Sequence, residues 1–370
     1  MKTMPLAALM LIAVAAVVVP QAVAQSAHPS VHLGPDLTID LHARIEGDTR
    51  LATPAIGRPE AAFGWESPRL GIEGKAFKAL TFEYSHDLGD RGELKDAYLD
   101  ARLTRGFEIE VGRFKLPMSP DALTGRHKLD FVNRSLAAQV LAPGRDIGVM
   151  THGKVLGKAV AYQAGYFLRD GDNARTSHTD GGRDAMAFRV TARPLLRAAP
   201  GAVAPLTVGA ALLASRLDSL LGLRGETAFG DGVFFDRLFV KGRRWRRAVE
   251  VTWQRGPASL SAEHIAVSDE RRGAGFEAES LAAVRARAWY VAGTWVVTGE
   301  RKNGWVEPRR ALTRAGAGAI EVVGRLEALH FDDAPYPGVD FGFPTGTRLL
   351  ANRSEEHTSE LQSRFGISYA

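Results

Sequence analysis

The chain of 370 residues contains no cysteine. This absence excludes disulfide frameworks and thiolate metal sites, and it agrees with an exported protein that needs no oxidative pairing. Long apolar stretches are also scarce. After the first 24 residues, no apolar run approaches the ~20 residues that a membrane-spanning helix requires. If the mature chain crosses a membrane, it must therefore cross as strands.

Motifs of common enzyme classes are missing as well. The sequence has no Gly-rich phosphate loop, no Gly-x-Ser-x-Gly turn and no His-Glu-x-x-His helix. We therefore expect no enzyme, no cofactor and no metal site, although an outer-membrane hydrolase whose Ser or Asp meets a His only in the fold stays open. The net charge of +5 favours anionic partners. An exported protein has little access to nucleic acid, so we expect none as a partner.

What the chain does have is long alternation of apolar and polar residues. Between Asp36 and Glu46 every second residue is apolar, namely Leu37, Ile39, Leu41, Ala43 and Ile45. A period of two predicts a strand with one apolar and one wet face. The pattern recurs in segments of roughly 9 to 11 residues, the length of a tilted bilayer-crossing strand. We predict about thirteen strands, at residues 36–46, 65–75, 78–88, 94–104, 106–115, 146–155, 158–168, 184–194, 206–215, 246–255, 258–267, 286–298 and 316–329.

Short and long connections alternate between these strands. Tight turns are predicted at Ala76-Phe77, Arg105-Gly106, Leu156-Gly157 and Gly256-Pro257, each with longer loops before and after it. Alternation of this kind is typical of an all-β transmembrane antiparallel β-barrel with tight periplasmic turns and long extracellular loops. The link at 299–315 is long where the pattern requires a short one. A soluble sandwich would show the same alternation within its strands.

The two ends of the chain differ from the middle. Lys2, an apolar run from Pro5 to Val19 and Ala22-Val23-Ala24 predict a signal peptide over residues 1–24, with an N-terminal membrane anchor as the alternative. Residues 353–370 resemble the translation of a DNA-sequencing adapter, with a polar natural tail as the alternative. We therefore expect a barrel domain over residues 25–352 that lacks its C-terminal strands. An odd count of thirteen fits this, because single-chain bacterial barrels have an even number.

Several stretches resemble the phosphate-selective porin O/P family. They are Val111–Pro117, Leu129–Leu136, Ala142–Val149, Thr298–Arg301 and Gly316–Glu321. The resemblance covers roughly residues 36–330. It implies a sixteen-stranded barrel in the bacterial outer membrane, in contact with its lipid, that assembles as a homotrimer and passes small anions such as phosphate by diffusion. The alternatives are a general porin for small polar solutes and a structural or adhesive barrel that does not conduct.

The longest loop in the first half of the chain, residues 116–145, is the predicted constriction. The resemblance implies that this loop folds inward and narrows the lumen. Arginine and lysine side chains there would replace the water that an anion loses, and arginine binds phosphate oxygens in a bidentate manner. The predicted anion path consists of Arg113, Lys115, Arg126, Lys128, Arg134 and Arg145. Alternatively these charges face solvent at the rim or pair with Asp121, Asp130 and Asp146.

A second set of cations follows from side-chain phase along the strands. Met186, Phe188 and Val190 share one phase, which puts Arg189 on the opposite, lumenal side. The same test predicts a lumenal ladder of Arg44, Arg69, Arg102, Arg189, Arg193 and Arg325. Many glutamates share these phases, so we expect a lumen of mixed charge with a modest preference for anions.

Overall fold

A computed structural model describes residues 29–34, 36–52, 60–89, 92–173, 182–196, 206–226, 233–303, 305–306, 308–309, 318–332 and 362–368. The described chain forms one 15-stranded sheet with two small two-stranded ribbons. All pairs in the sheet are antiparallel and follow the order of the chain, apart from the ribbons, which lie outside it. The predicted signal peptide, residues 1–24, lies outside the described residues.

The sheet consists of β1 (Ser30–Leu33), β2 (Leu37–Ala52), β3 (Glu60–Ala76), β4 (Leu80–Asp87), β5 (Glu93–Thr104), β6 (Phe107–Lys115), β7 (Arg145–Val155), β8 (Val160–Phe167), β9 (Gly182–Ala192), β10 (Thr207–Leu221), β13 (Phe239–Arg255), β14 (Ala258–Arg271), β15 (Leu281–Val296), β18 (Ala319–Phe331) and β19 (Gln362–Ser368). The ribbons pair β11 (Gly225–Glu226) with β12 (Val233–Phe235) and β16 (Lys302–Asn303) with β17 (Trp305–Val306). The helical turns are α1 (Pro120–Leu123), η1 (Arg126–Lys128), η2 (Ala137–Leu141) and η3 (Phe276–Ala278).

Each of the thirteen predicted strands is present, as β2 to β10, β13 to β15 and β18. The largest error in a strand boundary is at β13, which begins at Phe239 rather than at residue 246. The run Arg243-Arg244-Trp245-Arg246-Arg247 hides the alternation because both faces are polar there. Arg244 and Arg246 nevertheless point inward and are fully buried.

Strands β1 and β19 add one strand at each edge of the sheet. Strand β19 pairs with β18 from Ala319↔Ser368 to Arg325↔Gln362. It lies within residues 353–370, the segment predicted to come from an adapter, and the origin of that segment stays a prediction.

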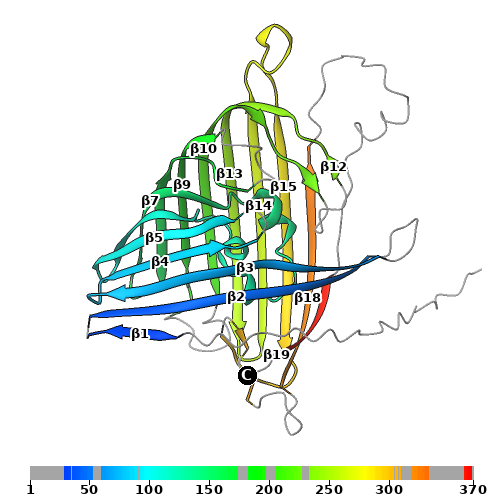
Figure 1. Cartoon of the computed structure of the whole chain (residues 1–370). Helices are drawn as coiled ribbons and strands as arrows, with labels where there is room; N and C mark the ends of the chain where they lie inside the picture. Colours follow the sequence, from blue (N-terminus) through cyan, green and yellow to red (C-terminus); the bar gives the residue numbers. More distant parts are fainter. Residues whose placement is uncertain are drawn as a thin grey trace, which may run out of the picture.

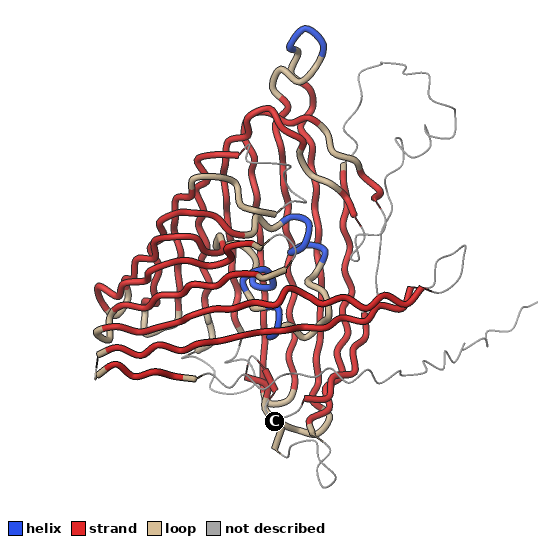
Figure 2. Tube along the Cα trace, in the orientation of Figure 1, coloured by secondary structure: helices blue, strands red, loops and turns tan. Residues whose placement is uncertain are grey.

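The sheet curls around an interior, with the blue N-terminal strands crossing the direction of the yellow C-terminal strands (Figure 1). The helical turns of residues 120–141 lie within the curl (Figure 2). The four predicted tight turns are confirmed, and left-handed residues close three of them: Phe77 (φ 52°) and Lys78 (φ 58°), Leu156 (φ 52°), and Gly256 (φ 58°). Such turns match the twist of the paired strands.

The two faces of the sheet differ in character. The outward face exposes large apolar side chains, such as Met186 at 63%, Val249 at 57% and Trp295 at 55%. The inward face is mixed: its fully buried side chains include the charged Arg244 and Arg246, and also apolar ones that form one cluster with the inward loop. A soluble sandwich would cover an apolar outer face, so its exposure on strand after strand favours a wall with hydrocarbon outside. Within the described part of the chain, no helix has the length and hydropathy to span a bilayer.

Candidate functional site: the lumen and its inward-folded loop

Residues 116–144 lie inside the curled sheet, against its inner face. The segment begins with α1, whose N-terminus is capped by Ser119: the backbone N–H of Ala122 donates to Ser119 Oγ at 3.1 Å. Ser119 Oγ also donates to Glu263 Oε2 on β14 at 2.9 Å, and the backbone N–H of Leu136 donates to Glu327 Oε2 on β18 at 2.7 Å. The loop is therefore bonded to the inner face of the opposite wall.

The second half of this loop is apolar, which explains why it stays inside. Leu136, Ala137, Val140 and Leu141 are fully buried, and η2 packs on β14 and β15. Burial of a leucine or valine side chain contributes roughly 1.5 to 3 kcal/mol. A loop of this composition would be unfavourable in the aqueous space outside the barrel.

Arg325 on β18 fixes the loop to the wall. Its Nη1 donates to Asn133 O at 3.0 Å and its Nη2 to Arg134 O at 3.1 Å. Its guanidinium also lies 4.5 Å from the centre of the Phe131 ring and 3.1 Å from Glu327 Oε1. Arg325 points inward, but its side chain is 3% exposed and lies under the loop, rather than in the open approach.

Two of the predicted constriction cations are paired with carboxylates. Arg145 donates Nε and Nη2 to the two oxygens of Asp96, at 2.8 and 2.9 Å. Arg113 Nη2 donates to Asp172 Oδ2 at 2.9 Å. Neither partner is among the aspartates that the sequence suggested. The bidentate pair with Asp96 uses only two of the five N–H donors of Arg145.

Two others hold the loop's backbone. Lys115 Nζ donates to the carbonyl oxygens of Ala122, Leu123 and Thr124 at 2.7, 2.9 and 3.1 Å, so it caps the C-terminus of α1. Arg134 donates to Thr124 O at 2.6 Å and to the carbonyl of Asp121. These cations bind the backbone of the inward loop and bring positive charge to it at the same time.

Arg69 on β3 differs from these four cations, each of which is bonded to a carboxylate or to the loop backbone. It lies directly opposite Arg44 on β2 in register, and both residues have the inward phase. Among the described residues, its buried Nε has no hydrogen-bond partner. Arg44 and Arg145 lie within electrostatic range of Arg69, as do Asp96 and Asp87. Two like charges in opposed positions are unfavourable unless something compensates them.

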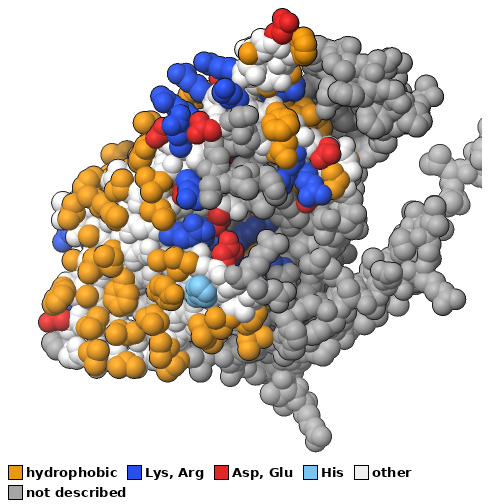
Figure 3. Space-filling model, turned by 45° about the horizontal axis from the view of Figure 1, so that its top comes forward, with side chains coloured by type: hydrophobic (Ala, Val, Ile, Leu, Met, Phe, Trp, Pro, Cys, Tyr) orange, Lys and Arg blue, Asp and Glu red, His pale blue; other side chains and the backbone are white. Residues whose placement is uncertain are grey.

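The loop extends this positive cluster. Burial lowers the pKa of Arg134, and the nearby charges of Arg145, Arg126 and Arg44 lower that pKa further, while Asp121 raises it. Arg126 is half-buried, and Lys128 is exposed. Basic side chains from two strands near the N-terminus, from β6 and β7 and from the inward loop thus gather at one level of the lumen. Figure 3, seen from the long-loop end, shows basic and acidic side chains together in the central hollow, with hydrophobic ones over the outer wall.

The remaining ladder residues lie nearer the tight turns. Arg189 donates Nε and Nη2 to Glu250 at 3.1 and 2.6 Å and Nη1 to Gln163 at 3.0 Å. Arg102 lies 3.6 Å from Glu108. Arg193 follows the end of β9 and is exposed. The predicted ladder is therefore divided between the level of the inward loop and the end of the sheet that carries the tight turns, here called the inner end.

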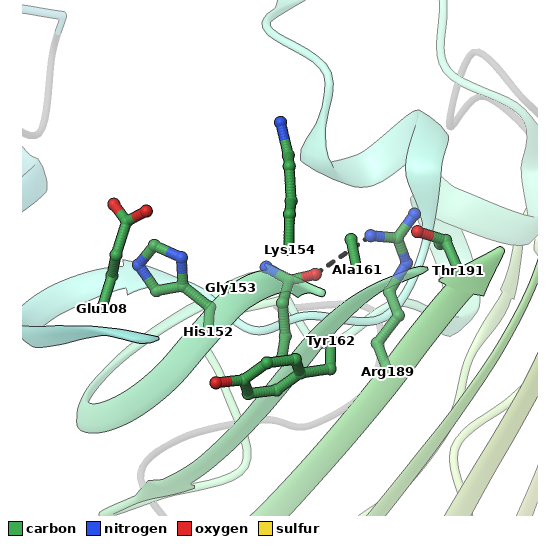
Figure 4. Close-up of a pocket in the computed structure, with 9 residues that line it drawn as sticks. Glu108, His152, Gly153, Lys154, Ala161, Tyr162, Arg189 and Thr191 are labelled. Atoms are coloured by element: carbon green, nitrogen blue, oxygen red, sulfur yellow. Dashed lines mark hydrogen bonds between the residues drawn. The ribbon is translucent and has the colours of Figure 1, made fainter. Parts of the chain in front are cut away.

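A pocket of about 170 Å³ opens beside Arg189 on the inner wall (Figure 4). It is lined by Glu108, His152, Gly153, Lys154, Ala161, Tyr162, Gln163, Arg189 and Thr191. In the described part of the chain, Asp100, Glu108 and His152 bring ligand atoms within 4.8 Å of one another, the arrangement that a cation would need. Arg102 beside Glu108 offsets part of their negative charge.

A buried charge network on β13 is not among the site residues predicted from the sequence. Arg244 Nη1 donates to Asp170 Oδ2 at 2.6 Å, and Arg246 Nη1 and Nη2 donate to the two oxygens of Asp170 at 2.5 and 2.8 Å. Arg244 also donates twice to Asp269, both at 2.6 Å. Burial alone would raise the pKa of Asp170, but Arg246 and Arg244 outweigh it and hold that pKa well below its usual range.

This network reaches the inward loop through Arg246 and through the segment that contains Asp170. Arg246 Nε donates to Leu141 O at 3.1 Å, and Asn173 Nδ2 donates to Gln139 O and Ala142 O at 3.0 and 2.6 Å. The sequence contains a signal for this network. Val249 and Val251 face outward, so the same alternation continued toward the N-terminus places Arg247 outward and Arg246 inward. A strand predicted to begin a few residues earlier would include Arg244 and Arg246 as inward residues.

Comparisons with known proteins agree with this geometry. Residues 43–340 match the model of the family described as phosphate-selective porin O and P. The outer-membrane channel DcaP of Acinetobacter baumannii is similar in structure, at 13% identity and a TM-score of 0.50, over 82% of this chain and 82% of that one. This likeness shows the fold.

Two further structures resemble the chain less closely. An anion-selective porin from Comamonas acidovorans has 14% identity and a TM-score of 0.46, over 82% of this chain and 92% of that one. OmpT of Vibrio cholerae in a trimer form has 14% identity and a TM-score of 0.49, over 81% and 80%. No curated protein sequence matches the chain.

Proposed function

Because the chain belongs to the phosphate-selective porin O and P family of outer-membrane porins, we propose that it is a passive channel for small anions, with phosphate and similar oxyanions as cargo. The loop at residues 116–144 narrows the lumen, and an anion passes the cations gathered around it. Transport needs no conformational cycle on this view, since the charges are already in place.

The observation that carries the proposal is the cluster around Arg69. Arg44 opposes Arg69 in register, and Arg145, Lys115 and Arg134 surround the same space. Asp96 is the carboxylate bonded to Arg145 there. An unpartnered guanidinium N–H at Arg69 can donate to a passing oxyanion without first breaking a bond in the protein. Its bonds are also reversible, as conduction demands.

A general porin for small polar solutes is the second candidate. The inner wall carries the carboxylates Asp96, Glu108 and Glu250 beside its arginines, and a lumen of mixed charge discriminates weakly by sign. We therefore expect a moderate preference for anions over cations rather than strict selectivity.

The test is single-channel recording in planar bilayers, under a KCl gradient, of the purified protein expressed from the gene re-sequenced beyond Asn352. Anion preference gives a reversal potential of the sign set by chloride, and added phosphate reduces the chloride current. Arg69→Gln lowers both the preference for anions and the block by phosphate. The control Arg193→Gln removes the same charge from an exposed site at the inner end, and it changes both quantities less.

Three outcomes would overturn the proposal. A reversal potential near zero in the unmodified chain indicates the general porin. Identical selectivity and phosphate block in Arg69→Gln and the unmodified chain removes the role assigned to Arg69. No conductance in a correctly inserted chain indicates a structural barrel.

The organisation of the whole chain follows from the same proposal. We propose a homotrimer of barrels formed by residues 25–352, exported by a signal peptide at residues 1–24 and followed by an adapter-derived tail at residues 353–370. Light scattering in detergent measures the assembly, N-terminal sequencing of the mature protein locates the cleavage site, and re-sequencing the gene beyond Asn352 without that adapter identifies the tail. A monomer, an uncleaved N-terminus or an unchanged downstream sequence would each contradict the corresponding part.

A further inference from the structure

The outer face of the wall carries a group of arginines at its long-loop end. We name this group the arginine belt; it consists of Arg183, Arg216, Arg243, Arg247, Arg285 and Arg287, all exposed. These residues come from β9, β10, β13 and β15. Figure 3 shows Lys and Arg side chains gathered along the upper rim of the molecule.

The strand register places belt residues side by side. Arg216 on β10 pairs with Arg183 on β9 and with Arg243 on β13, so three arginines occupy directly opposed positions. Ser215 and Leu217 are 3% and 2% exposed and point inward, which sets Arg216 outward. Farther along the wall, Arg247 and Arg287 flank a single residue of β14, Ala266.

Protein groups compensate only part of this charge. Asp218 lies 3.3 Å from Arg183, and Asp332 lies 3.8 Å from Arg287, each as an exposed pair. Glu270 accepts from the backbone N–H of Arg243 and also pairs with Arg272. Within the described ranges, the side chains of the belt residues at positions 216, 247 and 285 make no hydrogen bond or ion pair. Opposed like charges are unfavourable, so an anion outside the protein would stabilise the belt.

The same strands show which environment lies beside the belt. Toward the tight turns, the outward phase continues as apolar residues: Met186 at 63% exposure on β9, Leu212 at 42% on β10, Val249 at 57% on β13 and Trp289 at 39% on β15. In an outer-membrane porin this apolar face contacts hydrocarbon, and aromatic side chains gather near the interface. The belt follows directly above it, at the level of the lipid headgroups.

We propose that the arginine belt binds the phosphate groups of the lipids in the outer leaflet of the outer membrane. Arginine matches phosphate with its planar fork of donors, and its long apolar stem can cover the last hydrocarbon-facing surface while the charge reaches the headgroup. The site faces lipid, not the lumen, so it is independent of the anion path. It would fix the depth and tilt of the barrel in the membrane.

The test is binding of a bis-phosphorylated lipid A to the full chain in a non-ionic detergent, followed by tryptophan fluorescence and by the rise in the unfolding temperature. The variant R216Q/R247Q/R285Q removes three belt charges that make no bond to the protein. Each basic residue near an anionic headgroup contributes roughly fivefold to affinity, so the triple variant binds on the order of a hundredfold more weakly. The control R105Q/K158Q/R255Q removes three charges at the tight-turn end and retains the affinity of the unmodified chain.

Two further arms identify the source of the phosphate. A dephosphorylated lipid A binds the unmodified chain as weakly as the belt variant binds the phosphorylated lipid. Millimolar inorganic phosphate does not displace the lipid, because the hydrocarbon chains add to its affinity. Equal binding by both triple variants, equal binding of the dephosphorylated lipid, or displacement by inorganic phosphate would overturn the proposal.

A salt titration of the unmodified chain keeps the test decisive even if the belt variant does not fold. Affinity for the phosphorylated lipid falls as ionic strength rises, since exposed charges are screened within about 10 Å at 0.1 M salt. Salt-independent binding would contradict the proposal. The single-channel reversal potential is the same in the belt variant and the unmodified chain, which separates this result from any failure of the proposed anion path.

Discussion

Replacing Asp170 by asparagine is the sharpest perturbation of the network that supports the inward loop. Asp170 is 2% exposed, and the guanidinium groups of Arg244 and Arg246 beside it are fully buried. Arg244 keeps Asp269 as a partner, whereas Arg246 loses its carboxylate partner. Removing one member of a buried pair costs about 3 to 5 kcal/mol, because the other charge is left uncompensated. The shape of the side chain hardly changes, so we assign the loss to charge.

The effect should appear both in stability and in conductance. The free energy of unfolding in lipid vesicles, measured by urea titration, falls by about that amount in Asp170→Asn. Arg246 also donates to Leu141 O in the inward loop, so disturbing it loosens the loop and raises single-channel conductance. The control Asp218→Asn breaks an exposed pair with Arg183 and costs at most about 1 kcal/mol. If Asp170→Asn loses no more free energy of unfolding than the control and its single-channel conductance is unchanged, the reasoning is refuted.

The pH dependence of the unmodified chain follows from the same carboxylate. Because Arg246 and Arg244 hold the pKa of Asp170 below its usual range, the stability it contributes is fully present above the ordinary value of about 4. That contribution is lost only as the pH falls through the lower pKa of the folded chain. Between pH 7 and pH 4, therefore, protonation of Asp170 does not destabilise the network. If the unmodified chain loses stability above pH 4 and Asp170→Asn does not, this assignment is contradicted.

Two other substitutions test the wall and the loop. Gly112→Ala should prevent correct pairing of β5 with β6, because the glycine has φ +134° and an added Cβ would lie 2.2 Å from Ala97 O; Gly324→Ala, with nothing within 4 Å, is the control. Folding yields in detergent compare the two, and equal yields would contradict the prediction. Arg325→Ala removes two charged hydrogen bonds to the loop, each worth roughly 1.5 to 3 kcal/mol, and leaves Glu327 buried without its guanidinium partner. Single-channel recordings should show a wider and noisier pore, and a conductance equal to that of the unmodified chain would count against the role of Arg325.

Within a strand whose alternation is clear, side-chain phase predicts which side of the wall a residue faces. A period of two is a property of the backbone itself, so the phase of Met186 fixes that of Arg189, and Arg69 and Arg325 follow in the same way. Partners could not be predicted in this manner. Arg145 pairs with Asp96, 49 residues earlier, and Arg113 with Asp172, 59 residues later. Those distances depend on strand tilt and on how loops fold back, neither of which a local pattern contains.

The role of Arg325 shows a second limit. Phase placed this residue inside, but whether an inward arginine meets water or a folded loop depends on a segment almost two hundred residues away in the chain. The same is true of Arg244 and Arg246. Their charges interrupt the alternation of the strand in the sequence, whereas in the fold Asp170 and Asp269 compensate them. The role of a buried charge can be predicted only when the residue that compensates it is known.

The attachment points of the inward loop have a consequence for biogenesis. The loop belongs to the first half of the polypeptide, whereas the groups that hold it, Glu263, Arg325 and Glu327, are 144 to 192 residues downstream. The inward loop therefore cannot take its final position until β14 and β18 have formed. Folding intermediates that lack these two strands leave the loop without the groups that hold it, which makes its placement a late step in folding.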